Sequence, residues 1–570
     1  SGTIWLVTLL YVYGLKSVFI PWLWPVFNQI FLMVYLSTWL RRSGAMTGAE
    51  WITMRFGSGG SAEASRISVV FFALVSVIAF TGYAFVGIAK FSAIFLPDAF
   101  TPNTYALVII GITTLYTVLG GLYSVVLTDM IQFVIMIVAT VALGLIAMQQ
   151  VAPGSLPAVV PDGWQNLWFG WMLDLNWSEL MPAAARQMEK DGFTMFGAFF
   201  MMMVFKGVLL SAAGPAPNYD MQRILAAKNP REAALMSGLV TIVLFVPRYF
   251  MIAGVAVLAL LFLKDSVAAK GAIDLEQVLP IVIRDFVPVG LAGLLIAGLL
   301  AAFMSTFSGT INAAAAYLVN DCYKRYLRSG AGEREYIRAS YAASVVVVVV
   351  GCAAGYFRPS VAEWVDWIVS GLWGGYAAAN ILKWYWWRLN GFGYFWGMIT
   401  GIGCALLMLF SGVEIVTGVH FPEFKEWMAQ PVIYLVSLTH SGPPTTMNLD
   451  LMAFPMLLVV SLVGTLLGTY LTPPEREDVL IHFYTRTRPW GWWGPVREAA
   501  QRRDPSFQPN RNFARDIFNV IVGIVWQTAF VALPIYVVIH YWNAAAICVA
   551  VIVMTSAILK RTWYDRLETS

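Results

Sequence analysis

Long apolar segments alternate with short polar segments along almost the whole chain. Many of the apolar segments reach about 20 residues, the length that a helix needs to cross a bilayer. Lipid offers no hydrogen-bond partners, so a chain in that setting satisfies its own backbone by forming helices. The strict alternation of a membrane β-barrel is absent. The pattern therefore predicts an all-α integral membrane protein. Its expected spans are 3–14, 15–40, 66–95, 102–119, 122–150, 193–214, 233–263, 288–322, 336–357, 361–386, 391–415, 449–472, 514–540 and 542–560.

The polar segments between these spans differ in charge. Lysine and arginine gather in alternate loops, and the densest group of arginines lies in 473–513. Cytoplasmic loops carry an excess of lysine and arginine, so these loops are predicted to be cytoplasmic. The opposite loops, among them 151–192, are then extracellular. This outer loop holds four tryptophans and is read either as an interfacial helix or as a lid over a vestibule. The predicted location is the cytoplasmic membrane, with membrane lipid as a partner.

Composition supports this class and argues against others. Hydrophobic residues make up 59% of the chain and charged residues 12%, about half the charged share of soluble domains. The four cysteines have no metal-site spacing, and the four histidines lie in loops or at span ends. There is no HExxH motif and no phosphate-binding loop, and no filter loop typical of a channel. An enzyme, a channel and a nucleic-acid partner are not expected, and the oligomeric state is left open.

The span 288–322 carries the first polar motif. Ser305, Ser308 and Asn312 share one helix face, and Ala302 lies one turn before Ser305 and Thr306. A backbone carbonyl and two hydroxyls can form half of a shell for a hard cation, which prefers oxygen ligands. The alternative is that these hydroxyls bond back to helix carbonyls or join helices.

A second motif follows the glycine pair Gly120-Gly121, which is expected to end one helix and start the next. Asp129 lies about two turns into the following span, and Thr128 and Gln132 are close enough along the helix to be its partners. A carboxylate inside a membrane is costly unless it is paired or solvated, so it is a functional hypothesis by default. The alternative is a structural hydrogen-bond node.

Two further positions suggest contacts with a transported solute. Lys206 lies near the middle of the span 193–214, where a buried ammonium needs a carboxylate partner from the solute or from an acid such as Asp129. Trp367 lies near the outer end of the span 361–386, where it either covers the site or packs at the membrane interface.

Together these motifs resemble the sodium/solute symporter family. The matching motifs occur in family order: RFG at 55–57, GGL…V…TD..Q from Gly120, QR.LAA…..A at 222–233 and AA.MST.S….N at 301–312. The resemblance implies a leucine-transporter-like core of two inverted five-helix repeats. The implied organisation is a first repeat at 1–150, the outer loop at 151–192, a second repeat at 193–388, additional transmembrane helices at 389–472, a cytoplasmic loop at 473–513 and C-terminal helices at 514–570.

The resemblance also implies an activity and its residues. A small polar organic solute, such as a sugar, an amino acid or a carboxylate, would enter with sodium by alternating access; proton coupling on the same fold is the alternative. The carbonyl of Ala302 and the hydroxyls of Ser305 and Thr306 match the sodium ligands. Asp129, with Thr128 and Gln132, matches the sodium path. The solute candidates are Lys206, Ser308, Asn312 and Trp367.

Two departures from the family pattern are apparent. Tyr11 and Gly14 resemble a Tyr-x-x-Gly element, so the remaining sodium carbonyls are expected before Ser1, outside the given chain. Ala213 and Gly214 stand where sugar carriers of the family place bulky aromatics at the inner gate. Small residues there argue against a stacked-sugar mode.

Overall fold

The structure is a computed structural model. It describes 2–23, 27–45, 48–215, 219–263, 275–358, 360–410, 424–439 and 447–567, without the side chains of 23, 49, 119–129, 219, 220, 222 and 410. Within these ranges the regular structure is helical, apart from one isolated β-bridge between Trp386 and Trp492. The prediction of an all-α fold is confirmed.

The first part of the chain differs from its predicted spans. Instead of one span at 15–40, short 3₁₀ turns follow the first helix, because Gly14 has a φ of +58° and the following segment contains Pro21 and Pro25. The next helix begins only at Asn28. The elements are α1 (Gly2–Tyr13), η1 (Gly14–Val18), η2 (Ile20–Leu23), α2 (Asn28–Phe31), η3 (Leu32–Leu36), α3 (Ser37–Arg42), α4 (Gly48–Phe56), α5 (Gly60–Phe95) and α6 (Pro102–Gln150).

Helix α6 covers two predicted spans. The expected interruption at the glycine pair is not an end of the helix, since the helical backbone continues from Pro102 to Gln150. Its two apolar limbs are Pro102–Val118 and Met130–Gln150. The second limb leads into the outer loop, which contains η4 (Leu156–Ala158) and α7 (Pro182–Asp191).

The middle of the chain follows the predicted spans more closely. Helices α7 and α8 form a pair bent by 51°, and several later helices contain π-helical turns. The elements are α8 (Phe196–Ala212), α9 (Tyr219–Leu225), α10 (Pro230–Val240), η5 (Thr241–Phe245), α11 (Val246–Phe262), η6 (Leu275–Gln277), α13 (Val278–Phe286), α14 (Val289–Ala316), η7 (Tyr317–Leu327), α15 (Glu333–Phe357), α16 (Val361–Asp366), η8 (Trp367–Leu372) and α17 (Trp373–Tyr385).

The C-terminal part adds helices that the charge pattern did not predict. The polar segment 418–448 contains α19, and 473–513 contains α21 and α22. The elements are α18 (Gly391–Phe410), α19 (Phe424–Ser437), α20 (Leu449–Tyr470), α21 (Glu477–Thr487), α22 (Gly494–Arg503), α23 (Phe513–Val538), α24 (Trp542–Thr562) and η9 (Tyr564–Arg566).

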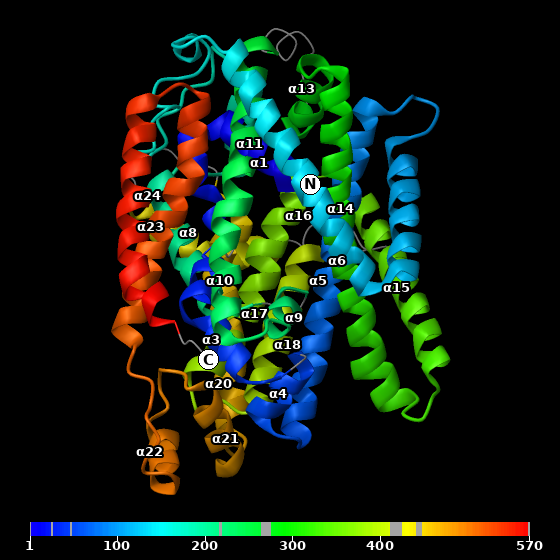
Figure 1. Cartoon of the computed structure of the whole chain (residues 1–570), viewed down its shortest axis with the longest axis vertical. Coiled ribbons are helices and arrows are strands. Elements are labelled where there is room, and N and C mark those ends of the chain that lie inside the picture. Colours follow the sequence, from blue (N-terminus) through cyan, green and yellow to red (C-terminus); the bar gives the residue numbers. More distant parts are fainter. Residues whose placement is uncertain are drawn as a thin grey trace.

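The helices form one elongated bundle (Figure 1). Nine helices of the described part are long and apolar enough to cross a membrane, or ten if the bent pair α7–α8 counts as one span. The outer loop 151–192 lies at one end of the bundle, and α21 and α22 lie at the other (Figure 1). This separation agrees with the sidedness predicted from the basic residues.

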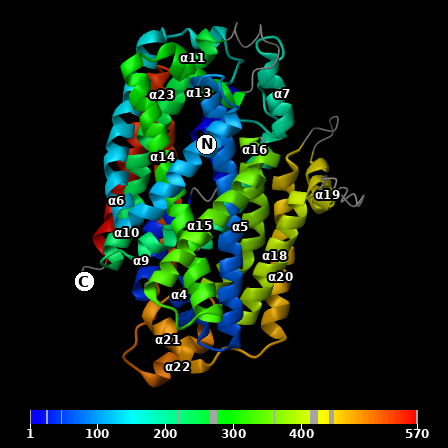
Figure 2. The ribbon, with the colours of Figure 1, turned by 90° about the vertical axis from the view of Figure 1, so that its right-hand side faces the viewer.

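Helices α18 and α20 pack side by side along one flank (Figure 2). Gly393 and Gly397 of α18 make this close approach possible, because a Cβ at either would collide with α20, whereas a Cβ at Gly401 would meet Gly375 of α17. The partners on α20 are Thr465 and Thr469. This is the small-residue packing that membrane helices use in place of a hydrophobic driving force.

The sidedness can be tested at Ser506, an exposed residue between α22 and α23. A single cysteine there is expected to resist an impermeant maleimide applied to intact cells and to react in inverted vesicles. Efficient labelling from outside would reverse the orientation. A cysteine at Ser178, exposed in the outer loop, is the matched control that should give the opposite result.

Candidate functional site

The predicted sodium ligands lie on α14. The Thr306 hydroxyl donates to the Ala302 carbonyl at 3.1 Å, so these two oxygens are neighbours. Ser305 is half-buried and Thr306 is exposed. The back-bonding that the alternative interpretation expected is therefore present at Thr306. It also brings two hard oxygens together, with Ser305 as the adjacent residue.

The second limb of α6 runs beside this part of α14. A Cβ at Gly298 would lie 3.4 Å from the Met136 Cα. The limb ends at the outer loop, whereas α14 starts at the outer side, so the two run antiparallel. Ala302 lies one turn after Gly298 on α14, and Gln132 lies one turn before Met136 on α6, so Gln132 is level with Ala302. The buried Oε1 of Gln132 has no hydrogen-bond partner among the described residues. The side chains of Thr128 and Asp129 lie outside the described part.

The other polar residues of α14 serve different contacts. The Ser308 hydroxyl is fully buried and forms a 2.7 Å hydrogen bond with the Thr117 hydroxyl of α6. Asn312 is half-buried, and its Nδ2 has no partner within the described ranges. The predicted common face therefore splits: Ser308 joins two helices, while Asn312 keeps an unused donor.

Lys206 is completely buried in the middle of α8. Its Nζ donates to the Ser370 hydroxyl of η8 at 2.8 Å and lies 5.5 Å from the centre of the Phe454 ring of α20. The structure records no carboxylate within ion-pair distance among the described residues, although Asp366 and Asp450 act on its charge through space. A buried ammonium held by one hydroxyl and one ring keeps donors for a further acceptor.

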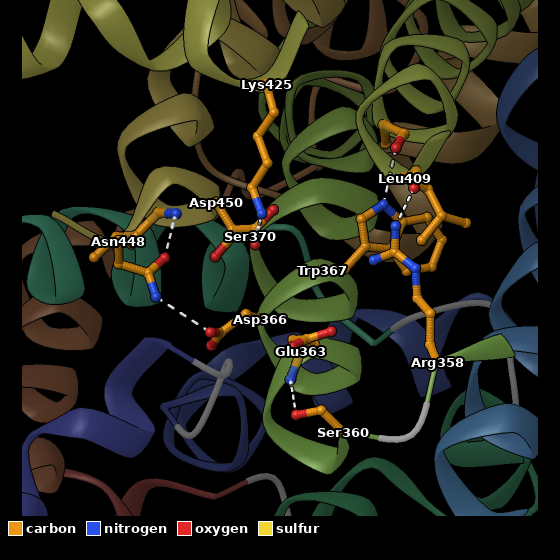
Figure 3. Close-up of polar contacts among 12 residues, drawn as sticks. Arg358, Ser360, Glu363, Asp366, Trp367, Ser370, Leu409, Lys425, Asn448 and Asp450 are labelled. Carbon is orange, nitrogen blue, oxygen red and sulfur yellow. Dashed lines mark hydrogen bonds and ion pairs between the residues drawn. The ribbon is translucent and has the colours of Figure 1, made fainter. Parts of the chain in front are cut away.

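Acidic and basic groups surround Ser370 on its outer side (Figure 3). Asn448 donates to the Asp366 carboxylate at 3.1 Å, and Lys425 forms an ion pair with Asp450 at 2.5 Å. Asp366 precedes Ser370 by one helical turn. These partners come from α19 and α20, which sequence reasoning did not connect with the solute site.

Trp367 points away from this cluster. Its indole N–H donates to the Ala405 carbonyl of α18 at 2.9 Å, and the side chain is buried beside Arg358 (Figure 3). These contacts join η8 to α18.

The outer loop is fastened to the end of α1. The indole N–H groups of Trp164 and Trp177 donate to the carbonyls of Tyr11 and Val12 at 3.1 and 2.9 Å. These carbonyls belong to the last turn of α1, which lacks helical partners. The loop also borders a cavity of about 940 Å³, whose lining includes the 87% exposed Trp168. Apart from Lys16, the residues that line this cavity all belong to the loop itself.

The small residues at the inner end of α8 meet aromatic side chains of α17. Trp384 donates its indole N–H to the Ala213 carbonyl at 3.1 Å, and Tyr385 donates its hydroxyl to the Ala212 carbonyl at 3.1 Å. Gly214 has a φ of +82°, and a Cβ there would lie 2.9 Å from the Trp384 Nε1. Ala213 and Gly214 are small, and the aromatic side chains that pack at this position come from α17 instead. Sequence reasoning missed both residues.

Comparison with known proteins gives consistent results. The sequence model of the sodium:solute symporter family matches residues 4–401. The chain is 28% identical to the sodium/myo-inositol cotransporter of Bos taurus over 355 residues, 57% of this chain and 46% of that protein. It is 25% identical to the sodium/myo-inositol cotransporter 2 of Oryctolagus cuniculus over 489 residues, 81% of this chain and 66% of that protein.

The first of these alignments shows that the chain spans about half the length of the curated relatives it matches. Among solved structures, a Na⁺-coupled sialic acid symporter in a substrate-bound outward-open state aligns with a TM-score of 0.48 and 14% identity. That alignment covers 83% of this chain and 91% of the symporter.

Proposed function

Because the chain belongs to the sodium:solute symporter family, we propose that it couples inward sodium flow to the uptake of a small polar organic solute by alternating access. The match over residues 4–401 carries this proposal, since it includes all four sequence motifs and both candidate sites. The core is then two inverted five-helix repeats at 1–150 and 193–388, with sites near the middle of the membrane. The membrane is the cytoplasmic membrane.

Sodium is proposed to bind at the Ala302 carbonyl and the hydroxyls of Ser305 and Thr306. The 3.1 Å separation of the Ala302 and Thr306 oxygens supports this assignment, and oxygen ligands suit a hard cation better than a proton site. The antiparallel register supports a path along Thr128, Asp129 and Gln132. The Gln132 Oε1, which has no partner among the described side chains, is proposed to face the passing ion.

The solute is proposed to contact Lys206. Among the four candidates this residue has the strongest support, because its buried ammonium keeps donors that the described residues do not use. Ser308 and Trp367 already bond to protein groups. The Asn312 Nδ2 has no partner among the described residues, but Asn312 lies two turns from Ser305. An anionic group on the solute would complement Lys206, and the gate candidates Ala213 and Gly214 lie two turns further along the chain.

The activity is tested by uptake into proteoliposomes. A panel of sugars, polyols, amino acids and monocarboxylates is supplied with an inward sodium gradient, with potassium replacing sodium, or with a proton gradient. Uphill accumulation of one class only with the sodium gradient is the expected result. Accumulation driven by the proton gradient alone would show that the coupling ion is the proton and not sodium. If no solute accumulated uphill under any gradient, the proposal would be overturned.

The sodium site is tested by Ser305→Ala and Thr306→Ala. Each substitution removes one oxygen ligand from the coordination shell of the cation, so the apparent sodium affinity is expected to fall roughly tenfold. It is read from the rise in melting temperature as NaCl replaces choline chloride, a ligand effect that needs no solute. Thr310→Ala is the matched control, since that hydroxyl also bonds back along α14, to the Thr306 carbonyl at 2.7 Å. Equal sodium responses in all variants would exclude the site.

A further inference from the structure

The inner end of α17 is held from two sides. On one side, Trp384 and Tyr385 donate to the carbonyls of Ala213 and Ala212, each at 3.1 Å. Tyr376, in the first turn of α17, donates to the Pro215 carbonyl at 3.5 Å. A helix leaves its last carbonyls without helical partners. The aromatic donors of α17 satisfy those at the end of α8, so the two helices are closed against each other here.

On the other side lies a short cytoplasmic segment, Trp490-Gly491-Trp492-Trp493, which we name the tryptophan clasp. Its backbone pairs with the end of α17: the Trp492 N–H donates to the Tyr385 carbonyl at 2.7 Å. The indole N–H of Trp493 donates to the Trp384 carbonyl at 2.9 Å. Gly491 has a φ of +128°, and a Cβ there would lie 2.6 Å from the Tyr385 oxygen. The clasp thus bonds the same two residues that close on α8.

Trp490 connects this end of α17 to the first half of the chain. Its ring stacks on Tyr385 with centroids 5.1 Å apart and also contacts Tyr35 at 5.0 Å and Trp39 at 5.1 Å. The hydroxyls of Tyr35 and Tyr385 share a 2.8 Å hydrogen bond. Trp490 also donates its indole N–H to Asp516 of α23 at 3.1 Å. The clasp therefore fixes the orientation of Tyr385 relative to three other elements.

We propose that Trp384 and Tyr385 form the inner gate and that the tryptophan clasp holds this gate closed. This inference rests on the proposed alternating access. Inward opening separates α17 from the end of α8, and it requires the rings of Trp384 and Tyr385 to leave the α8 carbonyls. The clasp opposes that movement because it fixes the backbone and the ring of the same residues. Trp490 and Trp493 are positioning residues, since they act through α17.

The test measures access to Ser211, which is fully buried on the last turn of α8. Ser211→Cys is placed in a chain whose four native cysteines are replaced by alanine, and its rate of labelling by a maleimide is measured in inverted vesicles. Trp490→Ala is expected to raise this rate roughly tenfold, because several aromatic contacts are lost. Trp493→Phe keeps the ring and removes one donor, so a smaller rise of about threefold is expected.

Trp492→Ala is the matched control. This side chain is 68% exposed and the residue bonds through its backbone, so the labelling rate should stay unchanged. A cysteine at Ser178 in the outer loop reports general unfolding and should react equally in every variant. Labelling requires neither solute nor sodium, so it is independent of the transport activity. An unchanged rate at Ser211 in both Trp490→Ala and Trp493→Phe would overturn the proposed clasp.

Discussion

Replacing Arg55 by alanine is expected to be among the most destabilising single changes in the protein. The Arg55 guanidinium is fully buried and donates to the carbonyls of Lys383, Trp386 and Leu389 at 3.0, 3.0 and 3.2 Å. The Lys383 carbonyl belongs to the last turn of α17 and the other two follow the end of this helix. All three would lose the Arg55 donor. Each such group costs about 1–3 kcal/mol, so a total of at least about 3 kcal/mol is expected.

The rings around Arg55 add to this loss. The guanidinium lies 5.0 Å from the centre of the Trp493 ring and 5.2 Å from that of Phe483. Arg55→Lys keeps the charge but loses the planar fork that reaches several acceptors at once, so an intermediate loss is expected. The melting temperature of the detergent-solubilised protein measures both effects.

Arg476→Ala is the control for Arg55→Ala. The Arg476 side chain is 81% exposed and pairs with Asp478 at 2.7 Å. A surface pair of this kind contributes at most about 1 kcal/mol. If Arg55→Ala melted at the same temperature as Arg476→Ala, the buried hydrogen bonds of Arg55 would not be holding the end of α17.

The sequence identified Arg55 only as part of a family motif, and its structural role could not be predicted. Its acceptors lie more than 320 positions further along the chain, and any backbone carbonyl can accept. The same holds for the bond between Trp493 and Trp384, which are 109 positions apart. Hydropathy predicts which segments cross the membrane, because each segment must form its own backbone hydrogen bonds inside the lipid. It contains no information on which tryptophan meets which carbonyl.

Some errors in the predicted helix boundaries can be traced to residues at the boundary itself. The boundary at Gly14 was predicted, since 3–14 and 15–40 were separate spans. The break inside 15–40 was visible as Pro21, a strong turn signal, but the apolar residues around it favoured a single span. The candidate site likewise combines contacts that the local sequence predicts with contacts that depend on the packing of distant helices. The Ala302 and Thr306 contact follows from helical spacing, whereas the link from Lys206 to Ser370 depends on how α8 and η8 pack.

The part of the chain after residue 388, which we name the C-terminal extension, had no predicted role. In the structure it contacts both ends of the segment formed by α16, η8 and α17. At the outer end, Asn448 binds Asp366, and Phe454 of the same α20 region lies against Lys206. At the inner end, the tryptophan clasp binds Trp384 and Tyr385. The extension therefore surrounds the helix on which both the proposed solute contact and the inner gate depend.

Lys206→Met is expected to abolish most solute uptake while leaving the protein at least as stable. Methionine is similar in length and apolar, so it removes a buried charge without opening a large cavity. Replacing buried charged groups by apolar ones of similar volume is often neutral or stabilising by about 1–4 kcal/mol. A solute anion deprived of its buried partner should lose at least about thirtyfold in affinity. Uptake and melting temperature are measured on the same preparation.

The competing role for Lys206 is to compensate the carboxylates of Asp366 and Asp450, which act on its charge through space. In that case Lys206→Met leaves Asp366 without a compensating cation, since Asp450 is paired with Lys425, and the melting temperature falls. Adding Asp366→Asn would then restore it, because the amide removes one negative charge and keeps the shape. For a solute contact the outcome differs: the double variant stays inactive, and stability is already intact in Lys206→Met alone. Normal uptake by the single variant would exclude a solute contact at this residue.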